Sequence, residues 1–167
     1  MTESERIHEV EKKLKRWRKL QEKAQEAVDD AAALAFSQGS AGGTVQSFTI
    51  SDKTYRGAEL LAAARGDIAW VAVIQEGMEW MKEERPELYY LLRGHYGMRY
   101  MRGYRKKYVR NFVGSYMTTY HIGPTLYHQR RNEALRELAA LAVQNGLLFV
   151  TRSHKENGRD AASSPCI

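Results

Sequence analysis

The sequence has one cysteine, three prolines and no long apolar run, and these shortages exclude several classes of protein. The single cysteine, Cys166, excludes an internal disulfide framework and a cysteine-based zinc site. No run of about 18 apolar residues occurs, which excludes a membrane-spanning helix. The segment MTESERIHEV is charged where a signal peptide would be apolar, so we expect a cytoplasmic protein.

The motifs that carry common enzyme chemistry are also missing. The chain has no HExxH, no GxxxxGK(S/T) and no G-x-S-x-G sequence. Its histidines lack metal-binding helical spacing, and no carboxylate lies between His121 and His128. We therefore expect a protein that is not an enzyme and that has no cofactor and no metal site.

Acidic residues are absent from one long segment of the chain. The whole sequence of 167 residues has a formal net charge of +6, from 26 Lys and Arg and 20 Asp and Glu. Residues 88–132 contain nine Lys or Arg and no Asp or Glu, and they hold nine of the ten tyrosines. Basic residues interleaved with aromatic ones are typical of a nucleic-acid-binding surface. The alternative is a solvated basic face with structural tyrosines behind it.

The spacing of apolar residues predicts an all-α fold. We expect residues 1–36 to be one element, a long amphipathic helix over 4–36, since no Gly or Pro precedes Gly39. Its apolar stripe has heptad spacing, which fits either a coiled-coil arm that forms a homodimer or a helix packed on its own domain. The stripe consists of Ile7, Val10, Leu14, Trp17, Ala24, Val28, Ala31 and Ala35.

Glycines and prolines divide the rest of the sequence, residues 37–167, into segments. Residues 37–54 are expected to be a linker with a short extended segment at 44–50 and a turn and helix start at 51–54, and residues 151–167 a mobile polar tail. Between them, residues 55–150 form a helical domain with a break near Arg65-Gly66-Asp67. Pro86 begins a helix that ends at Gly97, Gly103 separates it from the next, and Pro124 begins the last helix, capped by Asn145-Gly146.

The helices around the turn at 121–124 have the layout of a helix-turn-helix, over about residues 108–142. The start of the second helix would enter the major groove, where Arg pairs with guanine and Gln or Asn with adenine. The residues expected to read bases are Thr125, His128, Gln129, Arg131 and Asn132. Those expected to bind phosphate are Arg105, Lys106, Lys107, Arg110, Thr118, Thr119 and Arg130.

The stretch YMTTYHIGPTLYHQRRNEALRELAALA, residues 116–142, resembles the helix-turn-helix of sigma-factor region 4. It is more similar still to phage transcriptional regulators of the ArpU/RinA type. Where that family has a turn glycine, a cap serine and a threonine, this chain has His121, Gly123 and Leu126. The matching positions are Ile122, Tyr127, Arg131, Ala134, Leu135, Leu138 and Ala139.

The resemblance implies a regulator of late or packaging genes in a prophage, acting in the bacterial host cell. Such a protein binds double-stranded DNA and contacts RNA polymerase. Two alternatives stay open: a DNA-packaging protein of the small-terminase kind, and an antitermination factor that binds RNA polymerase. Whether residues 4–36 pair two chains also stays open.

Overall fold

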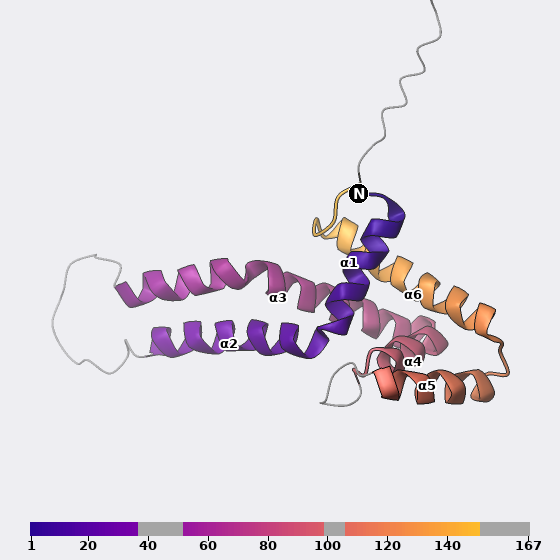
Figure 1. The fold of residues 1–167 in the computed structure, drawn as a ribbon. Helices are drawn as coiled ribbons and strands as arrows, with labels where there is room; N and C mark the ends of the chain where they lie inside the picture. Colours follow the sequence, from indigo (N-terminus) through magenta and orange to yellow (C-terminus); the bar gives the residue numbers. More distant parts are fainter. Residues whose placement is uncertain (37–51, 99–105, 151–167) are drawn as a thin grey trace, which may run out of the picture.

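In the computed structural model, residues 1–36, 52–98 and 106–150 are described, and in these ranges the chain is all-helical, with no strand. The prediction of an all-α fold is therefore confirmed. The helices are α1 (Glu3–Lys15), α2 (Trp17–Phe36), α3 (Asp52–Glu84), α4 (Pro86–His95), α5 (Lys106–Thr119) and α6 (Pro124–Gln144). Figure 1 shows that α2 and α3 form a long projection and that the other helices gather at one end of it.

The prediction of one helix over residues 4–36 is wrong, because the chain bends at Arg16. Thr2 begins α1 with a capping box, in which its hydroxyl accepts from the Glu5 amide and the Glu5 carboxylate accepts from the Thr2 amide. Arg16 follows α1 with φ −108° and ψ 14°, and α2 starts at the next residue in a different direction (Figure 1). The bend lets α1 lie against α6 while α2 lies along α3.

The predicted break near Arg65-Gly66-Asp67 is also wrong. Helix α3 runs without interruption through these residues. It starts at Asp52, within the helix start predicted at 51–54, so the linker ends before residue 52 and not at 54. A single glycine in a helix costs only about 1 kcal/mol relative to alanine, which packing along a long helix offsets. Residues 37–51, Gly103, and the tail 151–167 lie outside the described residues, and so does the predicted extended segment at 44–50.

The helix boundaries predicted at Pro86, Gly97, Pro124 and Gly146 are confirmed. Pro86 and Pro124 occupy the first turns of α4 and α6, where the missing amide hydrogen leaves no helical hydrogen bond unmade. Gly97 and Gly146 follow α4 and α6 with φ of 66° and 70°, a left-handed conformation that glycine adopts without strain. After Gly146 the chain turns back, so Leu148 is buried, whereas Phe149 is 73% exposed.

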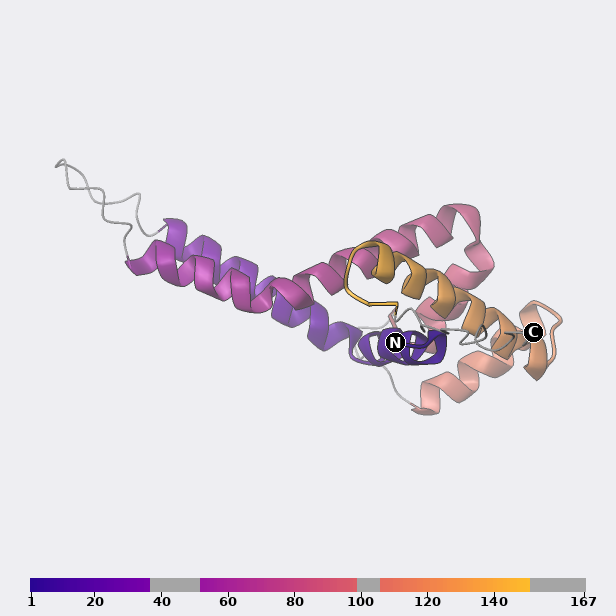
Figure 2. The same cartoon turned by 90° about the horizontal axis from the view of Figure 1, so that it is seen from above.

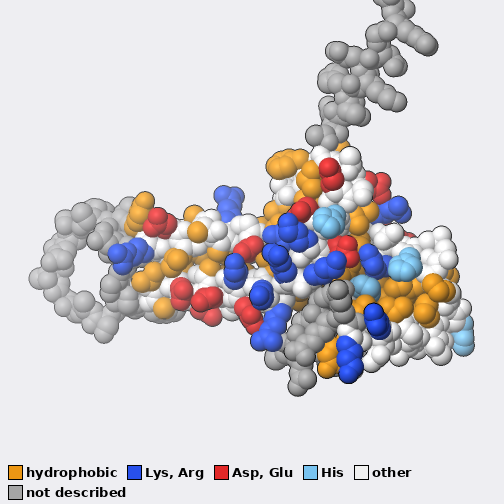
Figure 3. Space-filling view, in the orientation of Figure 1, with side chains coloured by type: hydrophobic (Ala, Val, Ile, Leu, Met, Phe, Trp, Pro, Cys, Tyr) orange, Lys and Arg blue, Asp and Glu red, His pale blue; other side chains and the backbone are white. Residues whose placement is uncertain are grey.

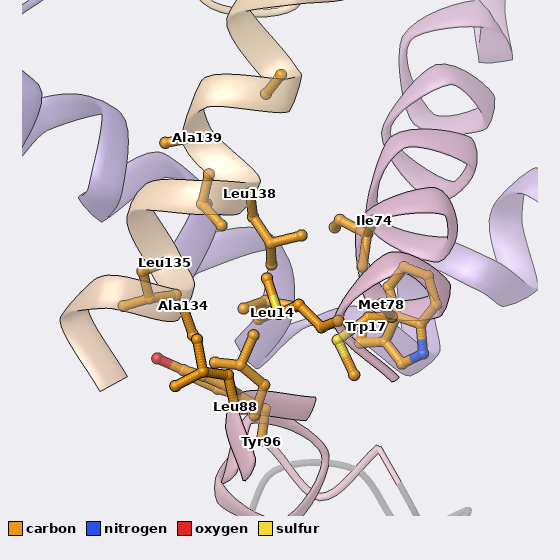
Figure 4. Close-up of a cluster of buried hydrophobic side chains, with 14 of the residues drawn as sticks. Leu14, Trp17, Ile74, Met78, Leu88, Tyr96, Ala134, Leu135, Leu138 and Ala139 are labelled. Carbon is orange, nitrogen blue, oxygen red and sulfur yellow. The ribbon is translucent and has the colours of Figure 1, made fainter. Parts of the chain in front are cut away.

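The core lies where all six helices of the described residues meet, at the root of the α2–α3 projection. Figure 4 shows Leu135 and Leu138 of α6 facing side chains from the other helices, among them Leu14, Ile74 and Leu88, which are completely buried. The approach of α3 to α6 is so close that a Cβ atom on Gly77 would overlap the Leu138 side chain. Half of the apolar stripe of residues 4–36 is buried within its own chain, namely Val10, Leu14, Trp17 and Ala24.

Candidate nucleic-acid interface

The turn between α5 and α6 fixes how the two helices meet. Its backbone closes with hydrogen bonds from the Ile122 amide to the Met117 carbonyl, 3.0 Å, and from the Tyr120 amide to the Tyr116 carbonyl, also 3.0 Å. His121 has φ 49°, the left-handed region that non-glycine residues seldom adopt. Gly123 then takes an extended conformation as the N-cap, and α6 starts at Pro124 (Figure 1). Four residues therefore separate the two helices.

Buried tyrosines hold the start of α6 against α4 and α5. The Tyr127 ring meets the Tyr116 ring edge-on at 5.6 Å, and the Tyr116 hydroxyl donates to the Glu87 carbonyl at 2.8 Å. Tyr96, Tyr116 and Tyr127 are all at least 96% buried. Part of the tyrosine enrichment of residues 88–132 therefore belongs to the core. This agrees with the alternative in which structural tyrosines lie behind a basic face.

The Tyr127 hydroxyl also lies 2.7 Å from Nδ1 of the buried His95. Burial lowers the pKa of His95 to about 4, and the positive charge of Arg131 acts in the same direction. Burial raises the pKa of Tyr127 as well. Both rings are therefore neutral at pH 7 and form a buried hydrogen bond between α4 and α6.

Four of the five predicted base-reading residues form one exposed stripe at the start of α6. Thr125, His128, Gln129 and Asn132 are exposed and follow one another at i, i+3, i+4 and i+7, the spacing that aligns side chains on a single helix face. The buried Tyr127 anchors the opposite side of the same turns. The stripe lies within the first nine residues of α6, at the end where backbone amides also favour anions.

Arg131, the fifth predicted base reader, faces α1 instead. Its Nη2 lies 3.3 Å from Oε1 of Glu11, whose carboxylate also accepts Lys15 Nζ at 3.1 Å. Burial alone would raise the pKa of Glu11, but the hydrogen bond from Lys15 and the charge of Arg131 outweigh it and lower the pKa. Side-chain exposures of 21% and 16% show that the Arg131–Glu11 pair is largely buried. In this arrangement Arg131 connects α6 to α1 and does not belong to the exposed stripe.

The predicted phosphate-binding residues are divided between exposed and covered positions. Lys107, Arg110, Thr118 and Thr119 are exposed on α5, and the Thr118 hydroxyl donates to the Gly114 carbonyl at 3.0 Å. Arg130 is half-buried, with its guanidinium 5.9 Å from the centre of the Tyr120 ring. Arg105 and the side chain of Lys106 lie outside the described residues.

Two features of this region had no usable signal in the sequence pattern. Glu11 and Arg131 are 120 residues apart, so nothing local indicates that they pair. Residues 12–23 contain seven Lys or Arg, but nothing in the sequence indicates which other part of the chain they lie beside. In the structure, Lys15 of that segment and Arg131 of α6 contact the same Glu11 carboxylate.

A scan against protein-family models finds no match, and searches of curated proteins and of solved structures find none either. Within residues 1–36, 52–98 and 106–150, no group of three His, Cys, Asp or Glu side chains could hold a metal ion. No helix of these ranges is long and apolar enough to cross a membrane.

Proposed function

We propose that the chain is a sequence-specific DNA-binding transcription regulator that reads the major groove with the first turns of α6. The observation that carries this proposal is the exposed stripe Thr125, His128, Gln129 and Asn132 at a helix start. Such side chains match the donors and acceptors of base edges, and an α-helix fits the width of the major groove. The exposed cations Lys107 and Arg110 on the preceding helix supply charge for the phosphate backbone.

The turn supports a helix-turn-helix of the sigma-region-4 kind. His121 has a left-handed φ at the position where the similar phage regulators have glycine, so the backbone geometry that glycine favours is present with a different residue. By that resemblance we propose a role in late-gene control of a prophage, in the cytoplasm of the host, with a contact to RNA polymerase.

A titration of the purified chain with a short mixed-sequence DNA duplex tests the proposal. Affinity should fall steeply, by roughly a thousandfold or more between about 50 and 200 mM salt if six or more phosphates are contacted. The double variant Lys107→Gln/Arg110→Gln should flatten the salt dependence, whereas a control pair at the other end of α6, Glu137→Gln/Gln144→Ala, should not. Absence of duplex binding at low salt would refute the proposal.

A packaging protein of the small-terminase kind is a second candidate, favoured by the projection of α2 and α3. Its outer part exposes Val28, Leu60 and Leu61, each about two-fifths accessible, which a ring of subunits would cover. The molar mass in solution separates the two candidates, because packaging requires a ring of many chains and transcription control a monomer or dimer.

A further inference from the structure

The bend between α1 and α2 carries an excess of positive charge that lies outside the proposed base-reading helix α6. Of residues 12–23, seven are Lys or Arg and one, Glu22, is acidic. This excess of six charges equals the net charge of the entire chain. In Figure 3 the Lys and Arg side chains gather over the bend and continue toward α5 and α6 on the same face of the molecule.

Carboxylates partner some of these cations and leave others available. The pairs at the bend are Lys12–Glu9 at 3.4 Å, Lys13–Asp67 at 3.7 Å, Lys15–Glu11 at 3.1 Å and Arg18–Glu22 at 2.6 Å. Arg16, Lys19 and Lys23 are exposed and have no carboxylate within 4.0 Å among the described residues. These three therefore keep their charge available for an external anion.

Helix α2 holds two of these three side chains on one face, and the third lies at the bend just before it. Lys19 and Lys23 lie at i and i+4 on α2, while Trp17, Leu20 and Ala24 are buried on another side. Arg16 directly precedes the helix, and its carbonyl accepts the Leu20 amide at 2.9 Å. At 1.5 Å per residue, the stripe from 16 to 23 extends about 10 Å. Phosphates advance about 3.4 Å along the axis per strand, so this length spans roughly three of them.

The bend is connected to α6 through one carboxylate. Glu11 contacts both Lys15, next to the bend, and Arg131, which directly precedes the exposed Asn132. The positive charges of Arg131 and Lys15 both act to lower the pKa of the buried His95. The Lys and Arg side chains of the bend lie on the same face of the molecule as those that continue toward α6 (Figure 3).

We propose that Arg16, Lys19 and Lys23 form a second DNA contact that binds backbone phosphates beside the bases read by α6. This inference rests on the proposed function, and it assigns the bend to positioning the duplex and not to reading its sequence. An acidic protein surface is the other partner that such a stripe could meet, and the experiment below separates the two.

The test compares the salt dependence of duplex binding for the parent, for Arg16→Gln/Lys19→Gln/Lys23→Gln and for a control with the same charge change on α3, Arg56→Gln/Arg65→Gln/Lys82→Gln. Glutamine keeps helix propensity, and all six positions are exposed, so each variant should fold, as circular dichroism checks. The slope of log affinity against log salt should fall by about 0.9 per lost contact, hence by roughly 2.7 for the bend variant. Its preference among sequences should stay unchanged, and the control should keep the parental slope.

Two results would overturn the inference while leaving the proposed function intact. One is a parental slope in the bend variant, which would assign the stripe to a protein partner. The other is an equal decrease in the α3 control, which would indicate bulk charge and not a contact. If the parent binds no duplex at any salt concentration, the proposed function and the inference both fail.

Discussion

The two ends of the α2–α3 projection differ in how their apolar residues are used. The head comprises α1, α4, α5, α6 and the ends of α2 and α3 packed on them, and it contains every large buried side chain of the described residues. The arm comprises α2 beyond Ala24 and α3 before Trp70, and Figure 2 shows its two helices side by side, away from the head. Its Val28, Leu60 and Leu61 keep about two-fifths of their surface accessible.

The difference shows that apolar periodicity alone does not create a core. Both regions have apolar residues at helical spacing, but only the head adds further helices that cover the seam between two of them. In the arm, the described residues add no further helix to the pair, and Val28, Leu60 and Leu61 stay about two-fifths accessible. Stability should therefore be concentrated in the head, where the proposed DNA-binding residues lie.

The largest contrast should come from truncating one leucine in each region. Leu14→Ala in the head removes a completely buried side chain and should lower the free energy of unfolding by about 2–5 kcal/mol. Leu61→Ala in the arm, at a 40% exposed position, should cost less than about 1 kcal/mol. Urea unfolding followed by circular dichroism measures both, and equal losses would refute the division into head and arm.

Acid should lower the stability of the head, because the buried His95 is neutral in the folded chain and protonated in the unfolded one. Its pKa is about 4 in the folded chain against 6.5 when unperturbed, so the unfolded state binds the proton first as the pH falls. The contribution is fully present above pH 6.5 and is lost progressively toward pH 4, to a total of about 3 kcal/mol. Urea unfolding across this range should show the loss in the parent and a flatter profile in His95→Asn. Parallel profiles would contradict the assignment.

Replacing a glycine with alanine should lower stability in the head and raise it in the arm. A Cβ atom on Gly94 in α4 would overlap the Phe112 ring of α5, so Gly94→Ala should lower stability by about 1–2 kcal/mol. A Cβ atom on Gly66 in α3 would have nothing within 4 Å, so Gly66→Ala should raise stability by about 0.5–1 kcal/mol through helix propensity. Thermal unfolding compares the two, and the same sign for both would show that α4 and α5 do not pack as described.

The smallest expected effect concerns the link between α1 and α6. Arg131→Gln breaks the pair with Glu11 and should lower the free energy of unfolding by about 1 kcal/mol, because the pair is largely but not fully buried. A double-mutant cycle with Glu11→Gln should show that the two effects are coupled. Sequence preference in DNA binding should remain parental, and a changed preference would return Arg131 to the base-reading set.

Local features of this fold were predictable from the sequence, and long-range ones were not. Pro86, Pro124 and Gly146 act through their own backbone geometry, so the helix boundaries next to them were correctly predicted. The bend at Arg16 has no glycine or proline to mark it and exists because α1 packs on α6. Helical spacing likewise predicted that Thr125, His128, Gln129 and Asn132 share a face, but the burial of Arg131 depends on a distant glutamate.

The most direct test of the account is selection of DNA sites from a random duplex pool by the purified chain. The parent should enrich one sequence motif. The triple variant His128→Ala/Gln129→Ala/Asn132→Ala, which alters only exposed side chains of α6, should enrich none and should retain salt-sensitive binding through its other cations. A variant that enriches the same motif as the parent, or a parent that enriches no motif, would contradict the claim that the start of α6 reads DNA.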